Sequence, residues 1–317
     1  MKIKKPLFSF WRKVDRLLGI DIGQNFVRLV ELSYCNSGYQ VEACLNIELN
    51  DDEGSDEVIV AAIENMLKQN PHKTKEAAVA LSHSVVIFKE IKVDADLSAE
   101  ETIEFLQFNL AEYVGETKND ISFDYQVVDS QTKTNNNVTL RLVAARRERI
   151  EKLVKLLQAV NLNSKIIDVD VYALERAVRL QLKNIVGLVA VININYGNIF
   201  IIVIDHKKIV YVHEDFIGSE NLESVTQVVE QLNLKLQLLH SGLPQPLEQV
   251  ILAGEKAMLF GLVDAVNSQL NIRVTLADPF SGMQLSAAVS SEAVQQVAPM
   301  MLISCGLALR VSDDYKN

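Results

Sequence analysis

The arrangement of apolar and polar positions predicts a chain built from alternating strands and helices. Residues 19–32 hold two apolar runs around a polar turn, which is typical of a buried strand, a tight turn and a second strand. The remaining strands are expected at residues 39–49, 76–81, 85–93, 123–129, 138–145, 164–169, 186–192, 199–204, 208–214, 249–252 and 273–276. Helical spacing predicts helices at residues 58–69, 98–114, 149–160, 170–182, 219–240, 258–270 and 299–309.

Local signals indicate where two of these helices begin. Ser98 followed by Glu101 predicts a capping box, in which each side chain accepts a backbone N–H of the other residue. Asp170 is expected to cap the helix that follows the strand at residues 164–169. Residues 193–198 are predicted to be the turn between two strands of a later hairpin.

The opening pattern occurs twice. The strand and hairpin that begin near residue 19 recur near residue 186, and an internal duplication of this kind indicates two matched lobes. A small α/β subdomain is predicted as an insertion into the first lobe. The expected divisions are a basic segment at 1–17, a first lobe at 18–183 with its insertion at about 86–145, a second lobe at 184–311, and a tail at 312–317.

Composition narrows the class of protein. The chain has 317 residues, 49% of them apolar, which is enough for about two globular domains. A net charge of −10 argues against a nucleic-acid partner, because phosphate needs a basic surface. Three cysteines without metal-ligand spacing indicate a reducing compartment. With no apolar run of membrane-spanning length and no signal peptide, a cytoplasmic protein is expected.

The N-terminal residues have a different character from the rest of this acidic chain. Residues 1–16 carry six lysines and arginines, with aromatic and aliphatic side chains between them. Such a segment can rest on anionic lipid. The alternative is a flexible tail whose aromatics pack on the domain, and the sequence leaves both interpretations open.

Other candidate chemistry is weaker. The five histidines lack the spacing of a zinc site, so no metal site is predicted. Residues 82–84 (Ser-His-Ser) resemble a nucleophile motif but lack a glycine elbow, and we interpret them as a polar turn. Asp168 and Asp170 could form a carboxylate pair, although the capping role of Asp170 is favoured. Residues 213–215 are expected at the surface end of a hairpin strand.

Several stretches in a fixed order resemble one family. The chain is similar to the type IV pilus assembly protein PilM family, actin-fold relatives of FtsA, over about residues 18–311. The resemblance rests on Gly19–Leu32, Leu142–Arg146, Ile167–Asp170, Ala277–Met283, and the segments at 298–299 and 306–310. It implies an α/β, actin-like ATPase (ribonuclease H-like) fold with two duplicated lobes, an inserted small subdomain and a reduced second lobe.

The resemblance also implies a role and partners. Proteins of this family are cytoplasmic components of a pilus inner-membrane platform and bind the cytoplasmic tail of PilN, a single-span membrane protein. The groove for that tail is formed by the inserted subdomain and its neighbour. The family also binds ATP between the lobes, and other platform proteins are expected as partners. A location peripheral to the inner membrane follows from the same resemblance.

This sequence departs from the family at its nucleotide-facing elements. The second hairpin reads Asn193-Ile194-Asn195-Tyr196-Gly197 where Asp-Ile-Gly is usual, and an amide can neither offset Mg²⁺ nor act as a base. Tyr196 is expected to fill space at this turn, and Glu255 to repel phosphate. The nucleotide-site residues, vestigial under this interpretation, are Asp21, Gly23, Gln24, Asn25, Arg28, Asn193, Asn195, Gly197 and Gly254.

These losses favour a non-catalytic scaffold with no cofactor, close to the divergent MSHA-type branch of the family (MshI). The alternative is a working switch, in which Mg-ATP closes the lobes and changes partner affinity. Asp21, Gly23 and Arg28 favour the switch, whereas Asn193, Asn195 and Glu255 oppose it. A sugar kinase of the same fold would need a catalytic aspartate and a larger second lobe, neither of which is found.

Overall fold

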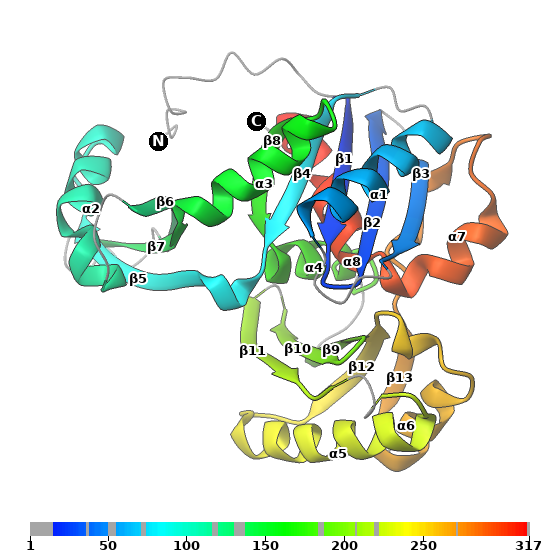
Figure 1. Cartoon of the computed structure of the whole chain (residues 1–317). Helices are drawn as coiled ribbons and strands as arrows, with labels where there is room; N and C mark the ends of the chain where they lie inside the picture. The colour runs from blue at the N-terminus through cyan, green and yellow to red at the C-terminus, as the bar shows by residue number, and fades with distance from the viewer. Residues whose placement is uncertain are drawn as a thin grey trace.

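The computed structural model describes residues 15–35, 38–49, 55–70, 74–115, 120–129, 137–182, 187–206, 208–218, 222–270 and 272–315. Three sheets organise these residues, and Figure 1 shows the first lobe above the second, with a smaller subdomain to one side. The interpretations given above for residues 1–14 concern a segment outside the described residues.

The first lobe is built on a six-stranded sheet in the order β14-β3-β2-β1-β4-β8. Strands β1, β2 and β3 form an antiparallel meander. Strand β4 pairs in parallel with β1, and β8 pairs in parallel with β4. The bounds are β1 (Arg16–Ile22), β2 (Phe26–Cys35), β3 (Gly38–Glu48), β4 (Glu76–Leu81), β8 (Asn163–Val169) and β14 (Gln284–Leu285). Helices α1 (Asp56–Gln69) and α3 (Arg147–Ala159) cover one face, because their buried apolar side chains pack with those of β1 and β4.

The second lobe has a five-stranded sheet in the order β11-β10-β9-β12-β13. The bounds are β9 (Leu188–Asn195), β10 (Asn198–Asp205), β11 (Lys208–Phe216), β12 (Leu247–Ala253) and β13 (Arg273–Leu276). Helices α5 (Val225–Gly242) and α6 (Leu262–Leu270) cover its outer face. Strands β9 and β10 are almost wholly apolar, as expected for strands buried on both faces.

One apolar core joins the two lobes. Helices α4 (Asp170–Val178) and α8 (Leu302–Ala308) pack together against the first-lobe sheet, and their core includes Val189, Val191 and Ile202 of the second-lobe sheet. The outer faces of the sheets have separate clusters. The two lobes are therefore held together by a shared apolar core as well as by the polar contacts described below.

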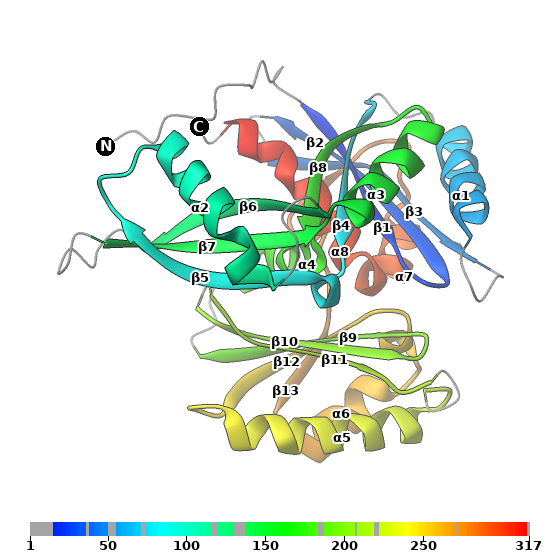
Figure 2. The ribbon, with the colours of Figure 1, turned by 60° about the vertical axis from the view of Figure 1, so that its left-hand side comes forward.

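The inserted subdomain is a three-stranded antiparallel sheet in the order β5-β7-β6, with α2 across one face (Figure 2). The bounds are β5 (Val86–Asp94), α2 (Ala99–Val114), β6 (Ile121–Asp129) and β7 (Asn137–Arg146). Leu106 and Leu110 of α2 pack on Leu140 and Leu142 of β7, forming a cluster separate from the lobe cores.

Most of the predicted elements are present, and one local signal is confirmed in detail. The Glu101 N–H donates to Ser98 Oγ at 3.2 Å, and the Ser98 N–H donates to Glu101 Oε2 at 2.8 Å, so the capping box forms as expected. The helix expected from residue 219 begins at Val225 instead, with a second capping box between Ser224 and Gln227. Helix α7 (Ser291–Val297) and strand β14 were not predicted.

Three further boundaries differ from prediction. The helix after β8 has Val169 at its N-cap position, so the capping role of Asp170 is wrong; Asp170 is the first helical residue. The helix expected at 258–270 starts at Leu262, after a 3-10 turn. Likewise, the closing helix is split into a 3-10 turn at Ala298–Met300 and α8. The positive φ of 84° at Gly261 accounts for the first of these breaks.

Among the described residues, no single helix combines the length and apolarity needed to cross a membrane. One bent pair, 291–300 and 302–312, passes by length and composition together, with a bend of 103°. The second member includes α8, which is fully buried in the core shared by the lobes.

Candidate interlobe site

An acid and a cation face each other inside the first hairpin. Asp21 of β1 and Arg28 of β2 are directly opposed in the antiparallel register, and they are only 8% and 1% exposed. Burial raises the pKa of Asp21 to about 6; Arg28 opposes this shift and Asp170 adds to it. Burial also lowers the pKa of Arg28 to about 10. Asp21 Oδ2 is buried without a hydrogen-bond partner among the described residues.

The Arg28 side chain reaches from the first lobe into the second. Its Nη1 and Nη2 each lie 3.2 Å from Asn195 Oδ1 at the end of β9, and both donate to it. Its Nε donates to Asn46 Oδ1 at 3.3 Å, and its guanidinium carbon lies 3.6 Å from the centroid of the Phe26 ring. The guanidinium is thus fixed along its edge by amides and over its face by an aromatic ring.

The turn of the first hairpin is packed by its own chain. A Cβ atom added to Gly23 would lie 2.3 Å from the Phe26 ring, so the ring covers this glycine closely. The Gly23 N–H donates to the Phe26 carbonyl at 3.0 Å. Gln24 is exposed at the turn, and the Asn25 carbonyl accepts the Leu49 N–H at 2.8 Å. Phe26 was not among the predicted site residues.

The second hairpin differs from its prediction. Strand β9 continues through Asn193 to Asn195, which pairs with Asn198, so only Tyr196 and Gly197 form the turn and the six-residue turn expected at 193–198 is wrong. The φ of 73° at Gly197 suits such a tight turn. Tyr196 is 47% exposed, with the Lys256 Nζ 5.8 Å from its ring centroid.

The turn after β12 closes against this hairpin. Gly254 has a φ of 85°, and a Cβ there would lie 2.4 Å from the Ile194 carbonyl oxygen and 2.6 Å from Asn193 Oδ1. Only glycine allows this approach. The Gly254 N–H donates to the Pro299 carbonyl at 2.8 Å, and the Glu255 N–H donates to Asn195 Oδ1 at 3.3 Å. The structure therefore connects Asp21, Arg28, Asn193, Asn195 and Gly254 around one seam between the lobes.

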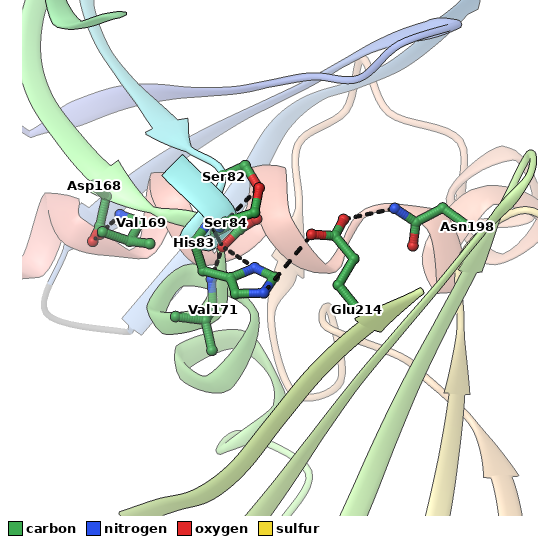
Figure 3. A network of polar contacts seen from close by, with 9 residues as sticks. Ser82, His83, Ser84, Asp168, Val169, Val171, Asn198 and Glu214 are labelled. Atoms are coloured by element: carbon green, nitrogen blue, oxygen red, sulfur yellow. Dashed lines mark hydrogen bonds and ion pairs between the residues drawn. The ribbon is translucent and has the colours of Figure 1, made fainter. Parts of the chain in front are cut away.

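A second polar contact crosses the lobes at His83 (Figure 3). His83 begins a short 3-10 turn between β4 and β5, and its ring stacks on Phe200 of β10 with centroids 4.6 Å apart and an interplanar angle of 13°. Its Nε2 lies 3.8 Å from Glu214 Oε2 of β11, and Glu214 Oε1 accepts the Asn198 Nδ2 hydrogen at 2.6 Å. The expected polar turn thus contains a lobe-to-lobe contact, and Glu214 faces His83 instead of ending the strand at the surface.

Asp170 completes the surroundings of His83. Its Oδ1 accepts the His83 and Val171 backbone N–H groups at 2.9 and 2.6 Å, and it lies 3.5 Å from His83 Nδ1. Burial lowers the pKa of His83, but Asp170 and Glu214 together outweigh it, so the net shift is upward. A histidine beside two carboxylates binds its proton more tightly than a free one.

Asp168 does not pair with Asp170. Its Oδ2 accepts from Arg176 Nη2 at 2.9 Å and from Arg310 Nη1 at 3.1 Å, while Arg176 Nη1 donates to the Gly306 carbonyl at 2.7 Å. These bonds tie α4 to α8 and to the 3-10 turn that follows it. The side chain therefore has a complete structural explanation as a buried, fully partnered carboxylate.

A cavity lies where the inserted subdomain meets the first lobe. Its volume is about 830 Å³, and it lies between the end of α2, the start of β6 and the first turns of α3. The lining residues are Ala111, Gly115, Asp120, Arg146, Arg147, Glu148 and Glu151. The lining is mostly charged, with both signs represented, as suits a polar or peptide ligand better than an apolar one.

The sequence interpretation missed three residues of this region. His83 and Glu214 contact each other although they are far apart in the chain, whereas Phe26 contacts Gly23 and Arg28 of its own hairpin. The local signals were present but ambiguous, since an aromatic after a turn and a histidine between serines are common in ordinary hairpins and turns. Only the packing of the two lobes brings His83 and Glu214 together.

Comparison with solved structures establishes the fold. A structure described as a PilM-PilN type IV pilus biogenesis complex matches with a TM-score of 0.77 at 18% identity, covering 95% of this chain and 99% of that chain. The ethanolamine utilization protein EutJ from Carboxydothermus hydrogenoformans matches with a TM-score of 0.51 at 14% identity, covering 93% and 89%. The activator of 2-hydroxyisocaproyl-CoA dehydratase from Clostridium difficile, solved with bound ADPNP, matches with a TM-score of 0.50 at 10% identity, covering 95% and 96%.

These likenesses confirm the predicted actin-like ATPase fold. At the level of sequence, residues 19–225 and 223–312 match the family model described as type IV pilus assembly protein PilM. The two matches together cover the first lobe with its insertion and nearly all of the second lobe. The chain therefore belongs to the type IV pilus assembly protein PilM family.

Proposed function

We propose that this protein is a non-catalytic scaffold of a type IV pilus inner-membrane platform, which binds the cytoplasmic tail of a PilN-like single-span membrane protein. The observation that carries the proposal is the PilM family match over residues 19–312, which includes the inserted subdomain. The fold likeness to a PilM-PilN complex supports the choice of partner. A cytoplasmic location at the inner membrane, contacts with other platform proteins and service of an MSHA-like pilus belong to the same proposal.

The cavity at the base of the inserted subdomain supports a place for the tail. Asp120 lies in its wall immediately before β6, and β6 pairs only with β7 among the described strands. An extended peptide can pair with such an open edge while one of its side chains occupies a neighbouring pocket. We infer that the tail lies along β6 with a charged side chain in the cavity, where Arg147, Glu148 and Glu151 provide both signs of charge.

Titration of the full-length protein with a synthetic tail peptide of the PilN-like protein from the same genome tests this proposal. We expect saturable binding by calorimetry. Arg147→Glu in the cavity wall is expected to weaken binding at least fivefold, which is about 1 kcal/mol. The matched control is Arg273→Glu on β13 of the second lobe, an exposed position outside the cavity.

Two results would contradict the proposal. No detectable binding at high micromolar peptide would remove the proposed partner. Equal affinities for the wild type, Arg147→Glu and Arg273→Glu would leave the partner in place but remove the cavity as its site.

We infer further that the interlobe seam does not fit a magnesium triphosphate. Phe26 covers Gly23, the glycine that would let backbone N–H groups approach phosphate. Arg28 is bonded to Asn195 across the space between the two hairpins, and Asn193 offers a neutral amide where a carboxylate would be needed to balance a metal ion. These observations support a scaffold without hydrolysis.

One observation favours the alternative, an ATP-dependent switch. Asp21 Oδ2 is buried with no hydrogen-bond partner among the described residues, and such an atom can receive a metal-bound water. Thermal unfolding with increasing Mg-ATP separates the two functions, because a ligand bound to the native state raises the unfolding temperature with concentration. A rise in unfolding temperature that saturates, and that Asp21→Asn abolishes, would establish the nucleotide-dependent switch. It would rule out the proposal of a scaffold that binds no nucleotide.

We also propose that the basic residues 1–16 contact the membrane surface. Co-sedimentation with vesicles tests it. The full chain is expected to bind vesicles containing an anionic lipid and not neutral ones, and binding should decline as salt is raised. Equal binding to both kinds of vesicle, or to neither, would contradict the proposal.

A further inference from the structure

The contact between Arg28 and Asn195 has no assigned role, although it joins residues 167 positions apart in the chain. We propose that Arg28 is an internal clasp that keeps the two lobes closed without a nucleotide. The chain's own side chains bridge the space between the two hairpins. This inference does not depend on the partner proposed above.

The clasp is held rigidly at its first-lobe end. Arg28 is 1% exposed, its Nε is bonded to Asn46, and its plane lies over the Phe26 ring. Asn46 belongs to β3, so the guanidinium is oriented by the neighbouring strand of its own sheet. A planar group fixed at its edge and its face presents its two terminal nitrogens in one direction. That direction leads to Asn195.

The second-lobe end is a shared acceptor. Asn195 Oδ1 accepts both terminal nitrogens of Arg28 and also the Glu255 N–H. The adjacent Gly254 N–H donates to the Pro299 carbonyl, just before α8 of the shared core. The hydrogen bonds therefore run from β2 to β9, on to the turn after β12, and then to the 3-10 turn that precedes α8. Opening the lobes would break this circuit at several points together.

The charge of Arg28 is already balanced within the protein. Asp21, Glu255 and Glu48 all act to hold its proton against the effect of burial. A polyphosphate would bring more negative charge to a place that contains these acids and one engaged cation. To bind there it would have to take Arg28 from Asn195 and displace Phe26 from Gly23. Lobe closure in this chain is thus supplied by the fold itself.

Hydrogen exchange followed by mass spectrometry on the full-length protein tests the clasp. In Arg28→Met, amides of residues 193–198 and 253–256 are expected to exchange at least tenfold faster than in the wild type. Asn195→Leu removes the acceptor from the other lobe and should give the same pattern, which covers the case in which Arg28→Met does not fold. The double variant should add nothing to either single change, because both break one interaction.

Controls separate a clasp from general loosening. Arg141→Met removes a partly exposed arginine bonded to Glu90 at 3.2 Å within the inserted subdomain, and should leave the seam peptides unchanged. Mg-ATP added to the wild type should not slow exchange at the seam. Wild-type exchange rates in both single variants, or clear protection of the wild-type seam by Mg-ATP, would overturn the proposal.

Discussion

The two hairpins that face each other across the lobes place one pair of residues at the same spacing and differ in the chemistry of that pair. In the first, Asp21 opposes Arg28; in the second, Asn193 opposes Phe200. The second member of each pair then contacts the other lobe. Arg28 donates to Asn195, whereas Phe200 stacks on the His83 ring. The matched position thus makes a charged hydrogen bond from the first lobe to the second, and an aromatic stack from the second lobe to the first.

The difference shows that two duplicated hairpins can both contact the opposite lobe although only one of them has a charged pair at the matched position. Burying the charged pair perturbs the pKa of both members, because each is removed from water. The second hairpin avoids that cost at the equivalent position with the Asn193 amide and the Phe200 phenyl ring, and the ring stacks on His83. At this paired position, charge is therefore balanced internally in the first hairpin and absent from the second, while both hairpins still contact the other lobe.

The largest expected loss of stability is at one of two glycines, which lie in the turn of the first hairpin and in the turn after β12. Gly254→Ala should lower the free energy of unfolding by on the order of 4 kcal/mol, because its Cβ would meet backbone atoms of Ile194 at a positive φ. Gly23→Ala meets the far end of the Phe26 ring, which can shift, so a loss of about 1–3 kcal/mol is expected. Urea unfolding followed by circular dichroism measures both. Equal losses would show that the first turn is as rigidly packed as the second.

The next effect concerns the buried carboxyl group. Burial raises the Asp21 pKa from 3.8 in the unfolded chain to about 6 in the folded one, so this group lowers stability as pH rises from about 4 to 6. At pH 7.5 Asp21→Asn should therefore raise the free energy of unfolding by about 3 kcal/mol, and near pH 4 by almost nothing. Denaturant titration at the two pH values measures this.

The reciprocal exchange in the second hairpin is the matched control. Asn193→Asp places an acid at the equivalent, equally buried position, and should destabilise the protein more at pH 7.5 than at pH 4. If Asp21→Asn proved less stable than the wild type at pH 7.5, attraction to Arg28 would exceed the cost of burial and the assigned balance would be reversed.

A smaller effect is expected for the stacked contact. Phe200→Leu keeps the apolar character of β10 but removes the stack on His83, and should cost about 1–2 kcal/mol. Phe216→Leu on β11, an exposed phenylalanine of the same lobe, should change stability by less than about 0.5 kcal/mol. Similar losses at both positions would show that Phe200 contributes only its surface area.

The smallest effect is pH dependence at His83. Its raised pKa means that the protonated ring stabilises the folded state, with the contribution fully present below pH 6.5 and lost as pH rises through the folded pKa. His83→Gln should remove this dependence, which we expect to amount to less than about 1 kcal/mol. Thermal unfolding between pH 6 and 8.5 measures it, with the exposed His213→Gln as control. A variant that retains the wild-type pH profile would assign the titration elsewhere.

Most features that depend on residues close together in the sequence were predicted, whereas most features that depend on distant residues were not. The hairpin strands and the Ser98 capping box depend on neighbours within a few residues, and both were predicted. The role of Asp170 was misjudged because a carboxylate at a helix start satisfies the capping pattern, whereas its oxygen is taken by the backbone of His83, 87 residues earlier. A local pattern cannot show which distant N–H will compete.

The site was predicted as a set of positions and not as an arrangement. Asp21, Arg28, Asn195 and Gly254 do meet at one seam, which follows from the duplicated fold. That Arg28 bonds to Asn195 could not be predicted, because this contact forms only once the hairpins are docked. Phe26 covers Gly23 from within the same hairpin, but an aromatic residue after a turn does not indicate by itself that its ring folds back over the glycine. The charge changes at Asn193 and Asn195 were visible in the sequence; their new partners were not.

The inserted subdomain has a consequence of another kind. It leaves the first lobe at Val86 and returns at Ala145, and these two residues are partners in the same ladder. Its apolar cluster is built from its own strands and helix. The two ends of the insertion are thus adjacent, so in the topology of the first lobe the whole insertion takes the place of a single loop. A module of this kind can be removed or replaced by design with the ladder of the host sheet left intact, which makes it separable from the lobes in experiments.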